Sequence, residues 1–191
     1  ADVIGGEKVS ARPSIGTGII GAYGMAAAVT GLTEAMAKRL GIKHQVIHLH
    51  PGSHAGYYPG AERVSLKVLF DPETGKLLGA QGIGFDGVDK RLDVFATALR
   101  AGMSVQAMQN LELSYAPPFG SAKDPVNMAA FVASNVLNGD IKIWQAEDYP
   151  EKTQGARMID VRTKEEFDIW HIPGAENFPL ATFRKDSEEW D

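Results

Sequence analysis

The clearest pattern of apolar and polar positions predicts a β-hairpin over residues 64–83. From Val64 to Phe70 every second residue is apolar, and two of the three residues between them are polar, which is the period of a strand with one buried face. Residues 71–75 (Asp-Pro-Glu-Thr-Gly) form turns readily, and residues 76–83 can return as the partner strand. We therefore expect two adjacent antiparallel strands here.

A period of 3.6 residues and matching cap residues predict helices on both sides of this hairpin. Val88, Leu92, Phe95 and Leu99 line one face of a segment that Gly102 closes. The other predicted helices cover residues 34–40, 104–109 and 125–137, with cap, start or stop residues at Thr33, Gly41, Ser104, Pro125 and Gly139.

Strand-like segments precede the hairpin. Residues 45–50 form a predicted strand that ends at Pro51, and the apolar stretch 17–29 is the first strand, although residues 23–29 depart from an ordinary strand pattern. Residues 1–16 are polar and aperiodic, which predicts the remnant of a helix that runs into a loop. The order strand, helix, strand, hairpin and helices predicts an α+β domain with a mostly antiparallel sheet.

The composition changes near residue 140, where we place a domain boundary. Residues 147–152 are polar, and residues 157–161 form a short apolar strand. The segment from Thr163 to Glu166 fits a capping box, in which the Thr side chain accepts from the N3 amide and Glu reaches back to the Thr amide. A strand followed so closely by a capped helix is typical of an α/β unit.

Composition and charge narrow the classes of function. The 191 residues carry a net charge of −5, and basic residues occur at most as dipeptides such as Lys38-Arg39 and Lys90-Arg91, which argues against nucleic acid as a partner. No apolar run approaches the ~20 residues that span a bilayer. The sequence has no cysteine, so its own residues supply no disulfide, thiolate ligand or thiol nucleophile. The expected compartment is the cytoplasm, without a secretory signal.

Two motifs suggest a dinucleotide site and a metal site, and the surrounding residues argue against both. Residues 16–21 (Gly-Thr-Gly-Ile-Ile-Gly) match the dinucleotide fingerprint, but residues 11–14 (Ala-Arg-Pro-Ser) make a poor buried strand before it. His44, His48 and His50 could share one face of a strand near His54 and bind a metal, but no acidic residue accompanies them. We therefore expect neither a cofactor site nor a metal site in this chain.

Two loops carry the candidate site residues. Residues 53–61 combine glycines and a proline with Tyr57 and Tyr58, and residues 114–119 place Tyr115 beside two prolines. Such loops can offer phenol groups to a ligand, or their rings can pack on the edge of the sheet, and chemistry alone leaves both interpretations open.

These loops resemble a known family. Residues 54–61 (His-Ala-Gly-Tyr-Tyr-Pro-Gly-Ala), 87–93 (Gly-Val-Asp-Lys-Arg-Leu-Asp) and 113–119 (Leu-Ser-Tyr-Ala-Pro-Pro-Phe) resemble the dimerisation domain of coenzyme A-disulfide reductases, NADH oxidases and persulfide reductases. The resemblance implies that this domain reaches the partner subunit's flavin site, where two tyrosines contact substrate near the redox cysteine. Tyr57 and Tyr115 are the matching positions, and we expect them to converge on one edge of the domain.

The end of the chain resembles a second family. Residues 159–162 (Ile-Asp-Val-Arg), 165–167 (Glu-Glu-Phe) and 171–175 (His-Ile-Pro-Gly-Ala) resemble the start of a rhodanese-like domain. The resemblance implies that Asp160 and Arg162 support the fold and that His171 shapes a loop. Catalysis in that family needs a cysteine in a later loop, which this chain lacks.

The expected organisation is therefore a remnant of a flavin domain and a loop (1–14), a reductase dimerisation domain (15–140) and the truncated N-terminal part of a rhodanese-like domain (141–191). The implied parent is an FAD- and NAD(P)H-dependent coenzyme A-disulfide or persulfide reductase. Within it this chain would form a homodimer and complete the partner's site, without binding cofactor or being active alone. The alternatives are a stand-alone accessory module that binds coenzyme A or a protein, and a metal-binding protein.

Overall fold

The computed structural model describes residues 4–6 and 13–186. The chain forms two compact units, residues 1–142 and residues 143–191, which are described separately. The flavin-domain remnant expected over residues 1–14 falls largely outside the described residues. No helix within the described ranges has the length and hydropathy needed to span a bilayer.

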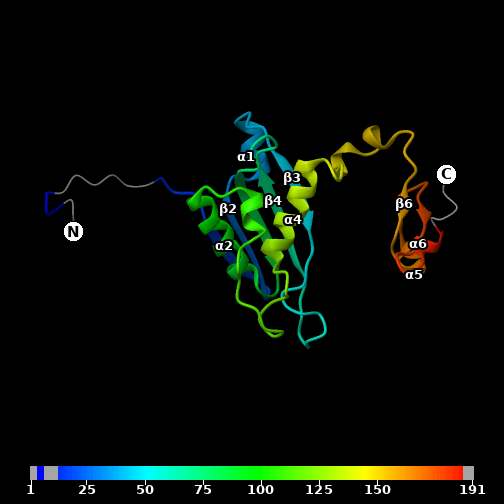
Figure 1. The fold of residues 1–191 in the computed structure, drawn as a ribbon, viewed down its shortest axis with the longest axis horizontal. Coiled ribbons are helices and arrows are strands. Elements are labelled where there is room, and N and C mark those ends of the chain that lie inside the picture. Colours follow the sequence, from blue (N-terminus) through cyan, green and yellow to red (C-terminus); the bar gives the residue numbers. More distant parts are fainter. Residues whose placement is uncertain (1–3, 7–12, 187–191) are drawn as a thin grey trace. The chain divides into compact units, whose positions relative to one another are not determined.

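The first unit is built on a five-stranded sheet that is antiparallel throughout, with the strand order β1-β2-β5-β4-β3 (Figure 1). Its strands are β1 (Gly18–Ala22), β2 (Met25–Gly31), β3 (Gln45–Leu49), β4 (Val64–Phe70) and β5 (Leu77–Gly84). Its helices are α1 (Glu34–Arg39), α2 (Val88–Ala101), α3 (Val105–Met108) and α4 (Pro125–Asn138). The predicted α+β class with a mostly antiparallel sheet is confirmed.

Helices α2 and α4 lie over one face of this sheet (Figure 1). The main core fills the space between these helices and the sheet. The alternating residues of β4 that include Leu66 and Phe70 are buried on this face, and Phe95 of α2 is fully buried. Gly82 of β5 lets Leu92 approach closely, because a Cβ at Gly82 would lie 2.6 Å from the Leu92 side chain. The predicted helical face of residues 88–99 is thus the face that packs on the sheet.

Helix α1 covers one end of the opposite face. Its Ala37 packs with Val46 and Leu69 in a small second core. A close approach of chain segments fixes the connection before α1, because a Cβ at Gly79 would lie 2.0 Å from the carbonyl oxygen of Leu32. Away from α1 this face carries exposed side chains, including Ile20 and Ile83.

The first apolar stretch corrects the prediction of a single strand over residues 17–29. It forms a hairpin, β1–β2, in which Ala22 pairs with Met25 across a two-residue turn. Tyr23 and Gly24 both have positive φ, 53° and 80°, as the common two-residue hairpin turn requires. Tyrosine rarely adopts this conformation. The turn therefore lacks the usual Asn-Gly or Asp-Gly signal, and the sequence does not reveal it.

The predicted helix caps are confirmed. The Thr33 side chain accepts from the Met36 amide, and the Ser104 side chain accepts from the Ala107 amide. Thr163 and Glu166 form the complete capping box. These caps satisfy amides that have no partner within the helix.

The second unit is small and half-exposed. It contains the 3-10 turns η1 (Ala146–Asp148) and η2 (Glu151–Thr153), the parallel strand pair β6 (Ile159–Asp160) and β7 (Glu176–Asn177), and helices α5 (Lys164–Ile169) and α6 (Phe183–Asp186). None of the residues whose burial is described in this unit (143–185) is buried. A parallel strand pair normally has both faces covered by other elements, but the residues of this pair are not buried. This unit therefore gains little stability from a core of its own.

An ion-pair group centred on Glu34 of α1 makes the stability of the first unit depend on pH. Glu34 lies 2.7 Å from the Lys38 ammonium and 2.5 Å from that of Lys67. Hydrogen bonds from Lys38 and then Lys67 lower the pKa of Glu34 from 4.5 to about 2. A pKa that is lower in the folded state adds stability above the unfolded value, and this stability is lost as pH falls toward the folded value.

We therefore predict that Glu34→Gln lowers the free energy of unfolding at neutral pH, and that its difference from the unmodified chain disappears between about pH 5 and about pH 2. Urea unfolding at a series of pH values measures this difference. Glu73→Gln is the matched control, because Glu73 pairs with Lys43 while both side chains are largely exposed. A constant difference between the Glu34→Gln variant and the unmodified chain over this range would contradict the prediction.

Candidate functional site

Tyr57 and Tyr115 lie on two loops that meet at one edge of the first unit. Their hydroxyl oxygens are 3.3 Å apart, although the residues are 58 positions apart in the sequence. The side chain of Tyr57 is 78% exposed and that of Tyr115 is 50% exposed, so both phenols can reach a ligand. The expected convergence of the two tyrosines is confirmed.

The first loop, residues 53–62, connects β3 to β4 and is closed at its base. The Ser53 amide donates to the Glu62 carbonyl at 2.7 Å, and the Glu62 amide donates to the Ser53 hydroxyl at 3.1 Å. Inside the loop the buried ring of His54 meets the Tyr58 ring edge-on, with centroids 5.8 Å apart. Tyr58 thus packs against the loop and leaves Tyr57 at its tip.

The second loop, residues 114–120, connects the segment after α3 to α4. The Phe119 and Gly120 amides both donate to the Ala116 carbonyl, which makes a tight turn around the two prolines. The Ala55 amide donates to the Gly120 carbonyl at 2.9 Å and joins this loop directly to loop 53–62.

A buried ion pair lies beneath both loops. The Arg91 guanidinium of α2, only 2% exposed, donates to the Ser53 carbonyl at 2.6 Å and to Asp124 Oδ2 at 3.0 Å. Asp124 Oδ1 accepts from the Val126 amide and so caps α4. The neighbouring Lys90 ammonium lies 3.2 Å from the Phe119 carbonyl and 4.0 Å from Asp124.

Glycine is required at position 87 to admit this guanidinium. Gly87 is the N-cap of α2 with φ of 71°, and its carbonyl accepts from Arg91 Nη1 at 3.2 Å. A Cβ at this position would lie 2.3 Å from that nitrogen. A side chain here would therefore strain the backbone and displace the arginine.

The tyrosine pair is suited to hydrogen-bond donation at neutral pH. The hydrogen bond with Tyr115 raises the pKa of Tyr57 above its ordinary value of 10.0. A phenol at pH 7 is neutral and carries a hydrogen that it can donate to an anion. Of two hydroxyls that share one hydrogen bond, one still has its proton free, so the pair can donate to a ligand while the bond between the phenols is kept.

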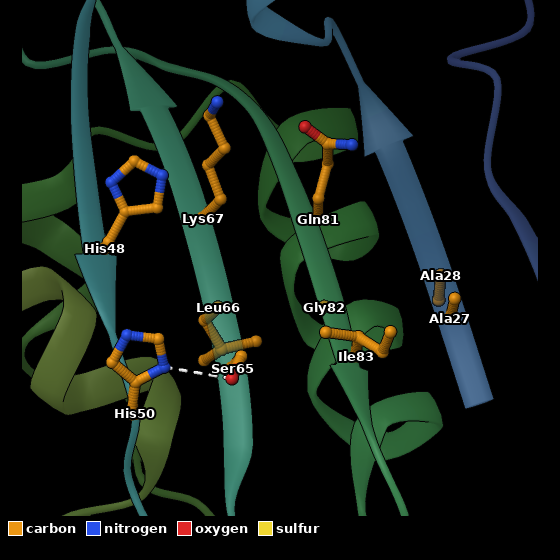
Figure 2. A pocket seen from close by; sticks show the side chains of 10 residues that line it. All are labelled: Ala27, Ala28, His48, His50, Ser65, Leu66, Lys67, Gln81, Gly82 and Ile83. Atoms are coloured by element: carbon orange, nitrogen blue, oxygen red, sulfur yellow. Dashed lines mark hydrogen bonds between the residues drawn. The ribbon is translucent and has the colours of Figure 1, made fainter. Parts of the chain in front are cut away.

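The histidines do not form a metal site within the described residues. His48 and His50 point into an open depression of about 450 Å³ on the uncovered sheet face, together with Lys67 and Gln81 (Figure 2). The Lys67 ammonium disfavours a cation there, and His50 Nδ1 lies 2.9 Å from the Ser65 hydroxyl. No group of three or more His, Asp or Glu side chains there is arranged to hold a metal ion.

The other histidines have separate partners. His44 Nδ1 lies 2.7 Å from the Ile42 carbonyl, and His54 is buried inside loop 53–62. The metal-binding alternative therefore gains no support from the described part of the chain.

The glycine motif at residues 16–21 does not form a dinucleotide cradle. Gly18–Ala22 is the edge strand β1, and the chain continues into a hairpin rather than a helix. The fingerprint needs a glycine turn that opens a helix toward pyrophosphate, and this segment opens no helix.

In the second unit the polar residues of the rhodanese-like resemblance hold the fold together. Arg162 Nη2 donates to Asp160 Oδ2 at 2.6 Å and to the Trp170 carbonyl at 2.7 Å. The bond to Arg162 lowers the pKa of Asp160. The His171 ring stacks on Phe167 with centroids 3.8 Å apart, and His171 Nδ1 lies 2.9 Å from the Phe167 carbonyl. These contacts are of the kind expected from two fold-supporting residues and a loop-shaping histidine.

Sequence reasoning missed the contribution of Lys90, Arg91 and Asp124. The sequence marks Lys90 and Arg91 as a basic dipeptide within the family-like segment 87–93, and it predicts no role for Asp124. An Asp directly before a Pro that starts a helix is a cap signal, so Asp124 could have been found as an N-cap. Its pairing with Arg91 depends on the tertiary fold.

Two family models match the chain. Residues 23–125 match the pyridine nucleotide-disulphide oxidoreductase dimerisation domain, and residues 136–191 match the rhodanese-like domain. Among curated proteins, coenzyme A disulfide reductase of Staphylococcus haemolyticus is 33% identical over 132 residues, which are 69% of this chain and 30% of that protein.

Two solved structures are similar over most of the chain. Reduced CoADR-RHD of Bacillus anthracis aligns with a TM-score of 0.92 and 42% identity, covering 100% of this chain and 34% of that one. A NAD-dependent persulfide reductase from A. fulgidus aligns with a TM-score of 0.82 and 32% identity, covering 93% and 32%. The chain thus spans about a third of the length of each of these relatives.

Proposed function

Because the chain belongs to the pyridine nucleotide-disulphide oxidoreductase dimerisation-domain family, we propose that it is the dimer-forming and site-completing part of a reductase of coenzyme A disulfide or a related persulfide. The observation that carries this proposal is the exposed hydroxyl pair of Tyr57 and Tyr115, with 3.3 Å between the oxygens. Relatives that are coenzyme A disulfide reductases or a persulfide reductase support the substrate class.

The chemical role of the pair is to donate hydrogen bonds to sulfur. Reduction of a disulfide or persulfide releases a thiolate or hydrosulfide, and a neutral phenol can stabilise the charge that develops on the leaving sulfur. Both tyrosines come from the dimerisation domain, so we propose that they act on the site of the partner subunit of a homodimer.

The flavin and nicotinamide chemistry belongs to the remainder of such a reductase. FAD and NAD(P)H would supply hydride and electron transfer when bound, and the glycine motif at residues 16–21 leads into strand β1 rather than into a helix that could face a pyrophosphate. The chain also has no cysteine, so its rhodanese-like segment supplies no thiol for sulfur transfer. We therefore expect no reductase or sulfurtransferase turnover from the isolated chain.

Dimer formation is the first prediction of this proposal. We expect the purified chain to sediment with twice the 20.6 kDa mass of one chain at micromolar concentration. Sedimentation equilibrium measures this mass. A monomer that binds coenzyme A saturably would instead support a stand-alone accessory module.

Catalysis is tested in a chimera, named here the reductase chimera. It joins this chain to the part of Bacillus anthracis CoADR-RHD that the chain does not match. The assay follows oxidation of NADH or NADPH with coenzyme A disulfide, and separately with a coenzyme A persulfide. Turnover that depends on either substrate supports the proposal, and a folded, flavin-loaded chimera that reduces neither one rejects it.

A further inference from the structure

The two tyrosines are held in place by residues beneath their loops rather than by packing of their own rings. Both rings are exposed, so contacts with a core do not fix their position. A backbone hydrogen bond from the Ala55 amide to the Gly120 carbonyl joins loop 53–62 to loop 114–120. This bond lies at Ala55 and Gly120, so it does not by itself set the distance between the phenols of Tyr57 and Tyr115.

Consecutive residues of α2 each hold one of these loops. Arg91 donates to the Ser53 carbonyl, at the closed base of loop 53–62. Lys90 contacts the Phe119 carbonyl at 3.2 Å and the Ser114 carbonyl at 3.5 Å, which are close to the two ends of loop 114–120. Because these cations are neighbours at the start of one helix, the helix fixes the distance between the points where the loops are held.

Asp124 joins the two cations. Its carboxylate, whose side chain is 4% exposed, lies 3.0 Å from Arg91 Nη2 and 4.0 Å from Lys90 Nζ. Arg91 Nε is buried without a hydrogen-bond partner. Burying these charges costs desolvation free energy that the pairing only partly offsets, so a gain in stability alone does not account for the arrangement. Hydrogen bonds from charged groups fix geometry strongly, and Arg91 and Lys90 each donate such a bond to a carbonyl of one tyrosine loop.

We propose that Lys90 and Arg91, joined through Asp124, are positioning residues that hold Tyr57 and Tyr115 at hydrogen-bonding distance. The group, called here the loop clamp, touches neither phenol, and its purpose rests on the proposed function of the pair. Lys90 is its testable member, because its side chain is 35% exposed and its removal leaves the buried pair of Arg91 and Asp124 in place.

The experiment uses the full 191-residue chain with selectively labelled tyrosine, which has only five residues to resolve. At neutral pH the nuclear Overhauser effect between the Tyr57 and Tyr115 rings reports their separation. Exchange of the Ala55 amide hydrogen reports the bond between the loops. We expect Lys90→Met to weaken the ring contact several-fold and to speed the exchange, and Lys90→Arg to retain both, because the cation is kept.

Lys123→Met is the matched control, because that lysine lies over the Phe131 ring and is not a member of the loop clamp. An unchanged ring contact and unchanged exchange in both Lys90→Met and Lys90→Gln would overturn the loop clamp while leaving the tyrosine pair intact. Absence of the ring contact in the unmodified chain would overturn the pair and the clamp together. A reductase chimera that reduces neither substrate while the ring contact is preserved would reject the proposed function alone.

Discussion

Tyr115→Phe is expected to lower kcat of the reductase chimera by about 10²–10³-fold, the usual cost of removing one hydrogen-bond donor from a developing anion. The substitution removes only the hydroxyl, and the ring, half-exposed on loop 114–120, keeps its place. Because the donor acts on charge that appears in the transition state, kcat and kcat/KM fall together while KM changes little. Steady-state kinetics with coenzyme A disulfide measure both constants.

The matched control is Tyr23→Phe, because that side chain is fully exposed in the β1–β2 turn. It also removes a tyrosine hydroxyl from this domain, and we expect unchanged kcat and KM. Tyr57→Phe is expected to resemble Tyr115→Phe, since each hydroxyl holds the other. Turnover of Tyr115→Phe close to that of the unmodified chimera would show that the pair contributes nothing to chemistry.

Asp124→Asn is expected to lower the free energy of unfolding by about 3–5 kcal/mol, because it leaves the buried Arg91 charge without its partner. Asparagine is itself a good N-cap, so the cap on α4 is retained and the loss reports the charge pair. Urea unfolding measures the change.

A double-mutant cycle isolates the interaction free energy between Arg91 and Asp124 from the other effects of each substitution. The variant Arg91→Met with Asp124→Asn is expected to lose less stability than the two single changes added together, with a coupling of about 0.5–3 kcal/mol. Glu73→Gln, at an exposed ion pair, is expected to change stability by less than about 1 kcal/mol. Strict additivity of the two single changes would contradict a direct interaction between Arg91 and Asp124.

Sequence predicted well those parts of the fold that neighbouring residues decide. The Thr33 and Thr163 caps need only a side chain and an amide three positions away. The hairpin over residues 64–83 follows from its alternation and its turn residues. The β1–β2 hairpin escaped prediction because its turn places Tyr23 at a positive φ that tyrosine seldom adopts. Three consecutive alanines in β2 (residues 26–28) and two glycines in β1 also weaken the strand signal of this stretch.

The candidate site was predictable in part for the same reason. Tyr57 and Tyr115 lie in loops whose local composition and family resemblance mark them. The residues that hold those loops come from α2 and from the start of α4, 33 positions apart. No local pattern pairs Arg91 with Asp124, since only the packing of the two helices on one sheet face brings them together.

The central claim, that this chain completes the site of a partner subunit, is tested most directly by mixing subunits. A reductase chimera carrying Tyr57→Phe and Tyr115→Phe is combined with the unmodified 191-residue chain, and heterodimers are purified with two affinity tags. Each heterodimer then has one flavin part and one intact tyrosine pair, carried by different subunits.

Turnover per flavin in this heterodimer is the deciding measurement. We predict that this turnover rises from the low rate of the doubly substituted chimera to nearly that of the unmodified one, because the intact pair reaches across the two-fold axis. A heterodimer that forms and stays as slow as the doubly substituted chimera would contradict the account.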